Sequence, residues 1–247
     1  IIGCNPAENH PISFKWIEKA VDNGAKLVVV DPRYTRSASK ADIYAQIRPG
    51  TDIAFLGGLI NYALKNNLAH LEYVRDYTNA SFIINDTYGF EEGLFCSFDD
   101  QEKTYDNKAW AYELDGSGNP KRDRSLKDPR CVYQLLKKHY SRYDLDTVCS
   151  ITGTKRGDYL AVADAFCNTG RSDRAGTILY AMGITQSTHG TQNVRAVAML
   201  QLLLGNVGIA GGGVNALRGE SNVQGSTDYG LLFHVLPGYL KSPEIDN

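Results

Sequence analysis

Three polar clusters in the first 52 residues combine side chains and spacing that could do chemistry. The first is the run Gly3–Asn9, the second begins at Asp31, and the third ends at Asp52. Each follows a short apolar stretch, so each is predicted at the carboxyl end of a strand. Ligands of open α/β sheets bind at that edge, where backbone N–H groups and helix N-termini face an anion. Together the clusters predict a nucleotide site.

Each cluster also has a plain structural interpretation. A carboxylate at Asp31 can accept both hydroxyls of a ribose, and one at Asp52 can accept paired N–H groups from a guanine edge. Arg33 follows closely enough to neutralise a phosphate. Either aspartate could instead cap a helix or turn, and residues 3–9 could be an ordinary turn with Asn9 as the helix cap.

A second polar site is predicted around Arg218. The loop 215–225 places this arginine among small and amide side chains, with hardly an aliphatic residue to bury. Glycines in such a loop let the backbone approach a polar ligand closely. The alternative is a mobile surface loop.

Several function classes are disfavoured by motif and charge. Neither a Gly-x-Gly-x-x-Gly turn after the first strand nor a P-loop motif occurs, which argues against standard dinucleotide and P-loop sites. A formal net charge of −2 gives no basic field for nucleic acid or anionic membranes. No apolar run approaches the roughly 18 residues of a membrane span, so no membrane insertion is expected. The five cysteines include no Cys-x-x-Cys pair, and buried or free thiols are expected.

The elements that must position these clusters alternate between strand and helix over residues 1–64. A helix is predicted from Pro11 to a C-cap at Asn23-Gly24. Strands are predicted at Leu27–Val30 and Ile43–Ile47, followed by an apolar helix at Ile53–Leu64. This order predicts an α/β fold with a parallel sheet. The apolar face of the first helix is expected to comprise Ile12, Trp16, Ala20 and Val21.

Three segments are predicted along the chain. Residues 1–84 form an α/β nucleotide-binding segment, 85–130 an inserted surface excursion, and 131–247 a second α/β segment with the glycine-rich loop. Both ends of the chain look cut, so a fragment is expected. Within the last segment the patterns predict helices at Val132–Tyr143, at Lys155–Asn168 with Thr154 as N-cap and at Asn193–Leu204, and a strand at Thr177–Tyr180.

Several longer motifs then follow one another in a characteristic order. They are Gly3–Pro11, Val30–Arg33, Ile47–Asp52, Met182–Gln186, Leu203–Asn206, Ala210–Gly219, the loop 215–225 and the excursion around Tyr105–Pro129. In this order they resemble the large catalytic subunits of molybdopterin oxidoreductases, and among those the formate dehydrogenases. The likeness runs over nearly the whole chain. It implies parallel-sheet nucleotide-binding domains of the formate dehydrogenase/DMSO reductase type.

The resemblance also implies a cofactor and a substrate. Molybdenum or tungsten would be held by two molybdopterin guanine dinucleotides, and a 4Fe-4S cluster would be bound by a part upstream of Ile1. Arg218 would face formate, whose oxidation gives CO2, since a guanidinium grips a small carboxylate with two hydrogen bonds. Glu220 departs from the residues associated with this position. The residues implied to bind the cofactor are Gly3, Asn5, Glu8, Asn9, Asp31, Arg33, Arg48, Gly50, Asp52, Met182, Gly183, Thr185, Gln186, Gly219, Asn222 and Gln224.

The resemblance further implies partners and a compartment. An iron–sulfur beta subunit and a cytochrome subunit are expected as partners, and the likeness to respiratory members implies a periplasmic location. No metal ligand is expected in this chain, because the metal-ligating selenocysteine or cysteine would lie upstream, and Cys4 sits in the predicted phosphate loop. His10 and His189 are expected to be structural or supporting. The alternatives are another molybdopterin oxidoreductase, of the nitrate reductase or formylmethanofuran dehydrogenase type, and a non-catalytic nucleotide-binding module.

Overall fold

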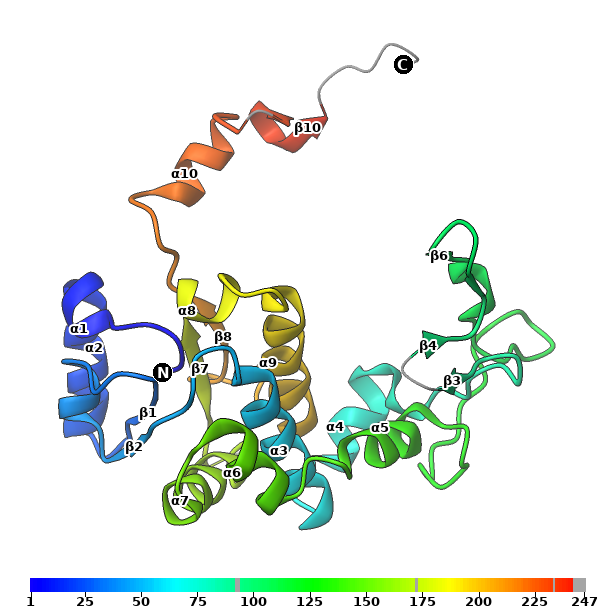
Figure 1. The fold of residues 1–247 in the computed structure, drawn as a ribbon, viewed down its shortest axis with the longest axis horizontal. Helices are drawn as coiled ribbons and strands as arrows, with labels where there is room; N and C mark the ends of the chain where they lie inside the picture. The colour runs from blue at the N-terminus through cyan, green and yellow to red at the C-terminus, as the bar shows by residue number, and fades with distance from the viewer. Residues whose placement is uncertain (92–93, 172, 233, 242–247) are drawn as a thin grey trace.

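A parallel sheet lies at the centre of the computed structural model, which describes residues 1–91, 94–171, 173–232 and 234–241. Strand β1 (Val28–Val30) pairs with β2 (Ile43–Ala45), and β7 (Thr177–Tyr180) pairs with β8 (Gly213–Ala216). Ile2 joins the two pairs, because it bridges Val30 on one side and Tyr180 on the other. The order is therefore β2-β1-Ile2-β7-β8, with all partners parallel, and the predicted α/β class is confirmed (Figure 1).

One side of the sheet is covered by α1 (Pro6–Asn9) and α2 (Pro11–Asp22). Phe14 of α2 packs with Leu27 and Val29 in a small core. The predicted apolar face of this helix was wrong at Ile12 and Trp16, which are each 68% exposed, whereas Val21 packs against the small core as predicted. Helix α2 has two apolar stripes at helical spacing, one with Ile12 and Trp16 and one with Phe14. The helical period alone does not say which of them packs on the sheet.

The larger core lies between the sheet and a layer of helices. Helices α3 (Asp52–Lys65) and α9 (Gly190–Leu204) supply its fully buried side chains, among them Phe55 and Leu200, which confirms both predicted helices. The Phe55 ring meets the buried Tyr159 ring edge to face, with centroids 5.0 Å apart. Around them stand α4 (Leu71–Tyr77), α5 (Val132–Tyr140), α6 (Leu145–Thr152) and α7 (Arg156–Cys167).

Two features of these helices differ from the sequence prediction. Helix α6 was not predicted, although Asp144 caps its start by accepting a hydrogen bond from the Thr147 N–H, and Gly153 ends it at a φ of 72°. Thr154 does not cap α7. Its hydroxyl donates to the Gln46 carbonyl at 2.7 Å, and the N-cap position is Lys155. A tertiary partner thus replaces the local one.

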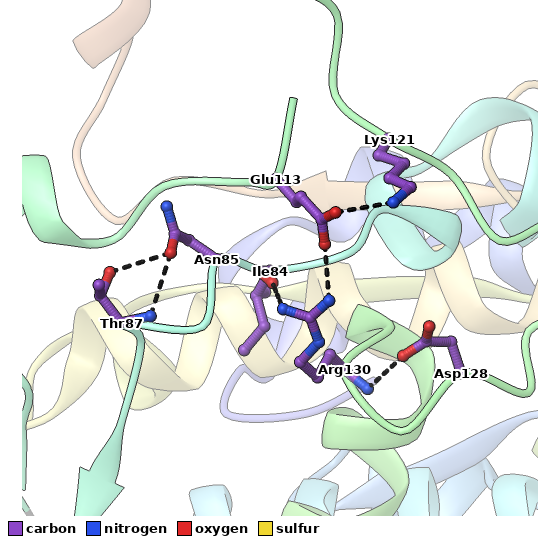
Figure 2. A network of polar contacts seen from close by, with 7 residues as sticks. All are labelled: Ile84, Asn85, Thr87, Glu113, Lys121, Asp128 and Arg130. Carbon is purple, nitrogen blue, oxygen red and sulfur yellow. Dashed lines mark hydrogen bonds and ion pairs between the residues drawn. The ribbon is translucent and has the colours of Figure 1, made fainter. Parts of the chain in front are cut away.

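The predicted insertion is built from short pieces that extend away from the sheet (Figure 1). Its outer part holds two hairpins and a turn of 3-10 helix: β3 (Phe90–Glu91) with β4 (Leu94–Phe95), β5 (Phe98–Asp99) with β6 (Thr104–Tyr105), and η3 (Asn107–Ala109). Leu114 also bridges Pro120 in antiparallel fashion and closes a further turn of the insertion. Figure 2 shows Glu113 at the base of the insertion, where it pairs with Lys121 at 2.7 Å and with Arg130 at 2.6 Å.

The remaining elements are short. Turns η1 (Ala38–Lys40) and η2 (Asn79–Ser81) precede β2 and the insertion, and α8 (Met182–Thr185) follows β7. After β8 the chain leaves the body through α10 (Val223–Asp228), β9 (Val235–Leu236), η4 (Pro237–Tyr239) and β10 (Leu240–Lys241) (Figure 1). In the part of the chain that the structure describes, no helix combines the length and apolarity needed to cross a membrane.

Candidate functional site

The three polar strand ends meet in one groove at the carboxyl edge of the sheet. This part of the groove encloses about 400 Å³. Its walls come from the loops after Ile2, β1 and β2, and from the segment after β7. The lining residues are Gly3, Cys4, Asn5, Asn9, Asp31, Pro32, Arg33, Pro49, Gly50, Asp52, Gly183, Gln186 and Ser187. The predicted convergence of residues 3–9, 31–36 and 48–52 is therefore what the structure shows.

A second hollow of about 520 Å³ continues the first toward Arg218. The two share Gly3, Cys4, Asn9 and Gly183, so they form one groove with Asp52 at one end and Arg218 at the other. The lining of the second part is completed by His10, Ala181, Met182, Leu217, Arg218, Gly219, Glu220, Ser221, Asn222, Val223 and Gln224.

The floor where the two parts meet is a backbone contact between two glycines. The Gly183 N–H donates to the Gly3 carbonyl at 3.0 Å. A Cβ on Gly183 would lie 2.6 Å from the Gly3 oxygen, and a Cβ on Gly3 would lie 2.7 Å from the Ile184 nitrogen. Gly3 also has a φ of 61°, which side chains rarely tolerate. Only glycine at both positions lets the strand-end loop and the start of α8 touch.

Two carboxylates line the far end of the groove. Asp52 is only 5% exposed, and burial raises the pKa of its carboxyl above the ordinary value, with a smaller upward push from the charge of Asp31 and a downward one from His189. Burial likewise raises the pKa of Asp31, whose Oδ1 accepts the Arg33 N–H at 2.8 Å. Two poorly solvated carboxylates side by side favour a ligand that brings N–H or O–H donors.

Asn5 and Glu8 hold the loop in place. The Asn5 side chain is buried: its Oδ1 accepts from the Ser37 hydroxyl at 2.8 Å, and its Nδ2 donates to Glu8 at 2.5 Å. Asn5 reaches the groove lining, whereas Glu8 does not. The Asn5 amide therefore anchors the loop to the turn at Ser37 and also borders the groove.

Arg48 and Thr185 also lie outside the lining. The Arg48 guanidinium donates to the Ser150 and Ile151 carbonyls at 2.7 and 3.0 Å, so it closes the C-terminal end of α6, where helices favour cations. Thr185 turns its hydroxyl back toward the Met182 carbonyl at 3.5 Å. The other predicted site residues all line the groove.

His189 and Cys4 support the walls. Nε2 of His189 lies 3.1 Å from the Gly50 carbonyl and ties the segment after β7 to the loop after β2. The Cys4 thiol donates to the Leu179 carbonyl at 3.6 Å, and burial raises the pKa of this thiol to about 11. Over the described ranges, no group of three or more His, Cys, Asp or Glu residues could hold a metal ion.

The loop that carries Arg218 has an unusual backbone. Arg218 has a φ of 68° and Asn222 a φ of 49°, and neither is glycine. Left-handed backbone at such residues is uncommon and gathers at functional sites. Gly219 packs so tightly on Met182 that a Cβ there would overlap the Met182 side chain. The structure thus presents the Arg218 guanidinium at an exposed end of the groove.

Sequence reasoning missed part of the lining. Pro32, Pro49, Ser187 and Leu217 were not singled out, and His10 was taken as structural although it borders the Arg218 end. All five adjoin residues that were predicted, so the signal was their position in the motifs. Their contribution to the groove is mainly backbone and shape, for which residue type gives little indication.

The chain belongs to the molybdopterin oxidoreductase family, whose model matches residues 1–239. It is 59% identical over 240 residues to the formate dehydrogenase subunit alpha of Megalodesulfovibrio gigas, and 54% identical over 244 residues to the nitrate-inducible formate dehydrogenase major subunit of Escherichia coli strain K12. These alignments cover 97% and 98% of this chain and 24% of each relative. The chain therefore spans about a quarter of the length of these relatives.

A further relative is the formate dehydrogenase 2 subunit alpha (cytochrome c-553) of Nitratidesulfovibrio vulgaris, 53% identical over 98% of this chain and 24% of its own length. Among solved structures, the acetylene hydratase of Pelobacter acetylenicus superposes with a TM-score of 0.53. That match covers 80% of this chain and 20% of the other at 23% identity, and shows a common fold. Family membership implies a molybdenum or tungsten pterin cofactor.

The groove fits a cofactor of this kind. It is long, its walls are backbone, amide and carboxylate groups, and its floor is a glycine contact that any Cβ would separate. A buried carboxylate at one end suits a base that carries paired N–H groups. These features match an extended nucleotide ligand with a polar head at either end.

Proposed function

We propose that this chain is the part of a formate dehydrogenase catalytic subunit that holds one molybdopterin guanine dinucleotide and presents Arg218 to formate. The observation that carries the proposal is the continuity of the groove from Asp52 to Arg218. The high identity to three formate dehydrogenase subunits supports the substrate. The periplasm as location and an iron–sulfur beta subunit with a cytochrome subunit as partners belong to the same proposal.

The residues of the groove would divide the work of holding the dinucleotide. Asp52 accepts hydrogen bonds from the guanine N–H groups, and Asp31 accepts from the ribose hydroxyls. Backbone N–H groups of residues 3–9 and the Arg33 guanidinium neutralise phosphate. Met182, Gly183 and Gln186 lie along the pterin, and Asn222 and Gln224 close the Arg218 end. Asn5, Glu8 and His189 keep the loops in register.

Arg218 would orient the substrate. Formate offers only two oxygens to grip, and a guanidinium can donate to both. Such charge-assisted hydrogen bonds stabilise by about 1.5–3 kcal/mol each. Holding both oxygens aims the C–H bond in one direction, so a random encounter becomes an oriented one. The chemistry supplied by the bound metal–pterin group is acceptance of the two electrons that formate releases with one proton on becoming carbon dioxide.

The test is Arg218→Lys in the full-length enzyme. Lysine keeps the charge but loses the planar pair of donors, so formate turnover should fall at least about 100-fold, the scale of a lost orienting contact. Bound metal and guanine nucleotide should remain at wild-type amounts. Lys121→Arg, far from the groove, is the matched control and should leave both quantities unchanged. Near wild-type formate oxidation in Arg218→Lys would overturn the substrate assignment, and a full-length protein without metal would overturn the cofactor assignment.

A further inference from the structure

The tip of the insertion carries a cluster of aromatic rings that leaves apolar surface exposed. Phe95 stands at its centre, with ring centroids 4.8 Å from Phe90 and 5.1 Å from Trp110. Tyr105 lies 5.4 Å from Trp110 and 4.9 Å from Phe98. We define Phe90, Phe95, Phe98, Tyr105 and Trp110, together with Leu94, as the aromatic tip.

The aromatic tip is exposed although its rings touch one another. Phe90 is 40% exposed, Leu94 47%, Phe95 39% and Trp110 37%. From Leu94 to Trp110 no residue is buried. Contiguous exposed apolar surface of this kind marks an interaction site, and aromatic residues are enriched where proteins meet. The polar group of Trp110 is already satisfied, because its Nε1–H donates to the Cys96 carbonyl. A partner would therefore need to cover only the apolar faces of this ring.

Ion pairs and hydrogen bonds brace the base of the insertion that carries this tip. Glu113 accepts from both Lys121 and Arg130, and Arg130 also donates to the Ile84 carbonyl (Figure 2). The Asp123 carboxylate is surrounded by N–H and O–H donors of residues 125–128, which lowers its pKa. A tip on a braced base loses little conformational freedom on binding, which favours affinity.

The charges around the aromatic tip indicate what covers it. Exposed carboxylates outnumber lysines in the stretch 86–108 that carries the rings, and of its two lysines Lys103 is already paired with Asp100. The one basic side chain with a ring contact to the tip is His139 of α5, whose ring centroid lies 6.4 Å from that of Phe90 among the described residues. The exposed acidic residues are Asp86, Asp99, Asp100, Glu102 and Asp106. An apolar centre with a charged rim is the pattern of an interface between separate polypeptides, because a permanent core would have to desolvate those carboxylates.

The same rim argues against a second copy of this chain, because two acidic rims repel. We propose that the aromatic tip docks a non-alpha subunit of the assembled enzyme, through a surface on that subunit with an apolar centre and a lysine- or arginine-rich rim. This rests on the proposed function in one respect only, that the chain works in a multi-subunit enzyme. The insertion extends from the end of the molecule away from the α1 and α8 edge, so docking there leaves the groove free (Figure 1).

The experiment is zero-length cross-linking of the purified enzyme complex with a carbodiimide. This reagent joins a carboxylate to a lysine ammonium only when the two are in direct contact. The expected products join Asp99, Asp100, Glu102 or Asp106 to lysines of a non-alpha subunit. Products that join them to alpha-subunit lysines outside residues 85–130, or to a second isotope-labelled alpha copy, would overturn the proposal. The absence of any cross-link at these four carboxylates, while other inter-subunit products form, would also overturn the proposal.

A pair of matched variants tests the apolar centre. Phe95→Ser should raise the Kd of the full-length alpha subunit for the non-alpha subunit about thirtyfold, the scale of a central aromatic contact. Leu114→Ser, an apolar-to-serine change at a residue that is 59% exposed and lies outside the ring cluster, should change that Kd less than about threefold, as peripheral contacts do. Equal effects from both variants would contradict the proposal.

A third variant keeps the test independent of how Phe95→Ser folds. Glu102→Lys should slow association and weaken its dependence on salt, and an unchanged salt dependence would count against an acidic rim at the interface. Formate turnover of each variant with a small-molecule electron acceptor should stay at the wild-type rate. Loss of docking can therefore be told apart from failure of the proposed function, which would abolish turnover in the wild type as well.

Discussion

The groove and the insertion use aspartate in opposite ways. In the groove, burial raises the pKa of Asp31 and Asp52, and few donors of the protein meet them. In the insertion, hydrogen bonds from neighbouring residues lower the pKa of Asp115 and Asp123. The insertion carboxylates complete their own loops, whereas the groove carboxylates lack partners that a ligand can supply. One residue type therefore builds structure in one region and prepares binding in the other.

The two regions also differ in what holds them. The groove depends on backbone touching backbone at Gly3 and Gly183, with buried helices behind it. The insertion depends on ion pairs such as Glu113 with Arg130, whose side chains remain partly exposed. Close packing tolerates no added atom, while exposed ion pairs contribute little each. Substitutions should therefore have much larger effects in the groove than in the insertion.

The largest effect is expected from Gly183→Ala. The new Cβ would lie 2.6 Å from the Gly3 oxygen, so one wall of the groove must move. We expect a loss of about 3 kcal/mol in the free energy of unfolding, typical of overpacking at a rigid site, and loss of bound nucleotide from the full-length protein. Denaturant unfolding and nucleotide analysis check this.

The matched control is Gly157→Ala in α7, where a Cβ meets no atom within 4 Å. Alanine in an open helix position should stabilise by about 0.5–1 kcal/mol. If both variants gave the same change in stability, close packing would not be what distinguishes the groove.

The next effect is expected from Asp52→Asn in the full-length enzyme. Removing the charge should weaken guanine nucleotide retention by about 10- to 150-fold, the equivalent of about 1.5–3 kcal/mol for a charge-assisted hydrogen bond. Retention can be measured by cofactor exchange. Glu8→Gln, a nearby carboxylate outside the lining, should have a much smaller effect.

Asp52→Asn should also stabilise the cofactor-free protein at neutral pH. A carboxyl whose pKa is raised in the folded state opposes folding once it is ionised, so the advantage of asparagine is present above that pKa and disappears as pH falls toward 3.8. A variant less stable than wild type at neutral pH would show that Asp52 is already satisfied without a ligand.

The smallest expected effects are changes in local stability when the pH is lowered. Hydrogen bonds from Ser125, Lys127 and Asp128 lower the pKa of Asp123, so this carboxylate contributes stability that is complete above its unfolded pKa and is lost as pH falls through the folded one. Acidification from neutral pH should therefore first protonate the groove carboxylates Asp31 and Asp52, which removes their unfavourable buried charge. Below about pH 4 it should then loosen residues 123–128. Hydrogen exchange at these amides, with Asp123→Asn as control, measures this. Loosening of the groove before the insertion would contradict the comparison.

Much of the groove could be predicted because its signals are local. A strand followed by Gly3–Asn9, Asp31 or Asp52 places each cluster at a strand end, and parallel strands share one edge. The same reasoning found β7, α3 and α9. Strand β8 at Gly213–Ala216 was not predicted, because glycine has a low strand propensity. This segment is extended because it pairs with β7.

The side chains whose partners could not be predicted from the sequence make contacts with distant residues. Arg48 is drawn to the end of α6, Asn5 to Ser37 and Thr154 to Gln46, each across at least 32 positions of the chain. A polar side chain near a predicted site has several possible partners, and residue type does not rank them. The exposed Trp16 teaches the same lesson for apolar residues, since α2 offers two stripes and the sheet takes only one.

The most direct test of the central claim is a density map of the intact, cofactor-loaded subunit. The guanine base should lie against the Asp52 carboxylate, with the ribose at Asp31 and the pterin running past Gly183 toward Arg218. A nucleotide bound elsewhere, with the loops at 3–9, 31–36 and 48–52 left in contact with solvent, would contradict it.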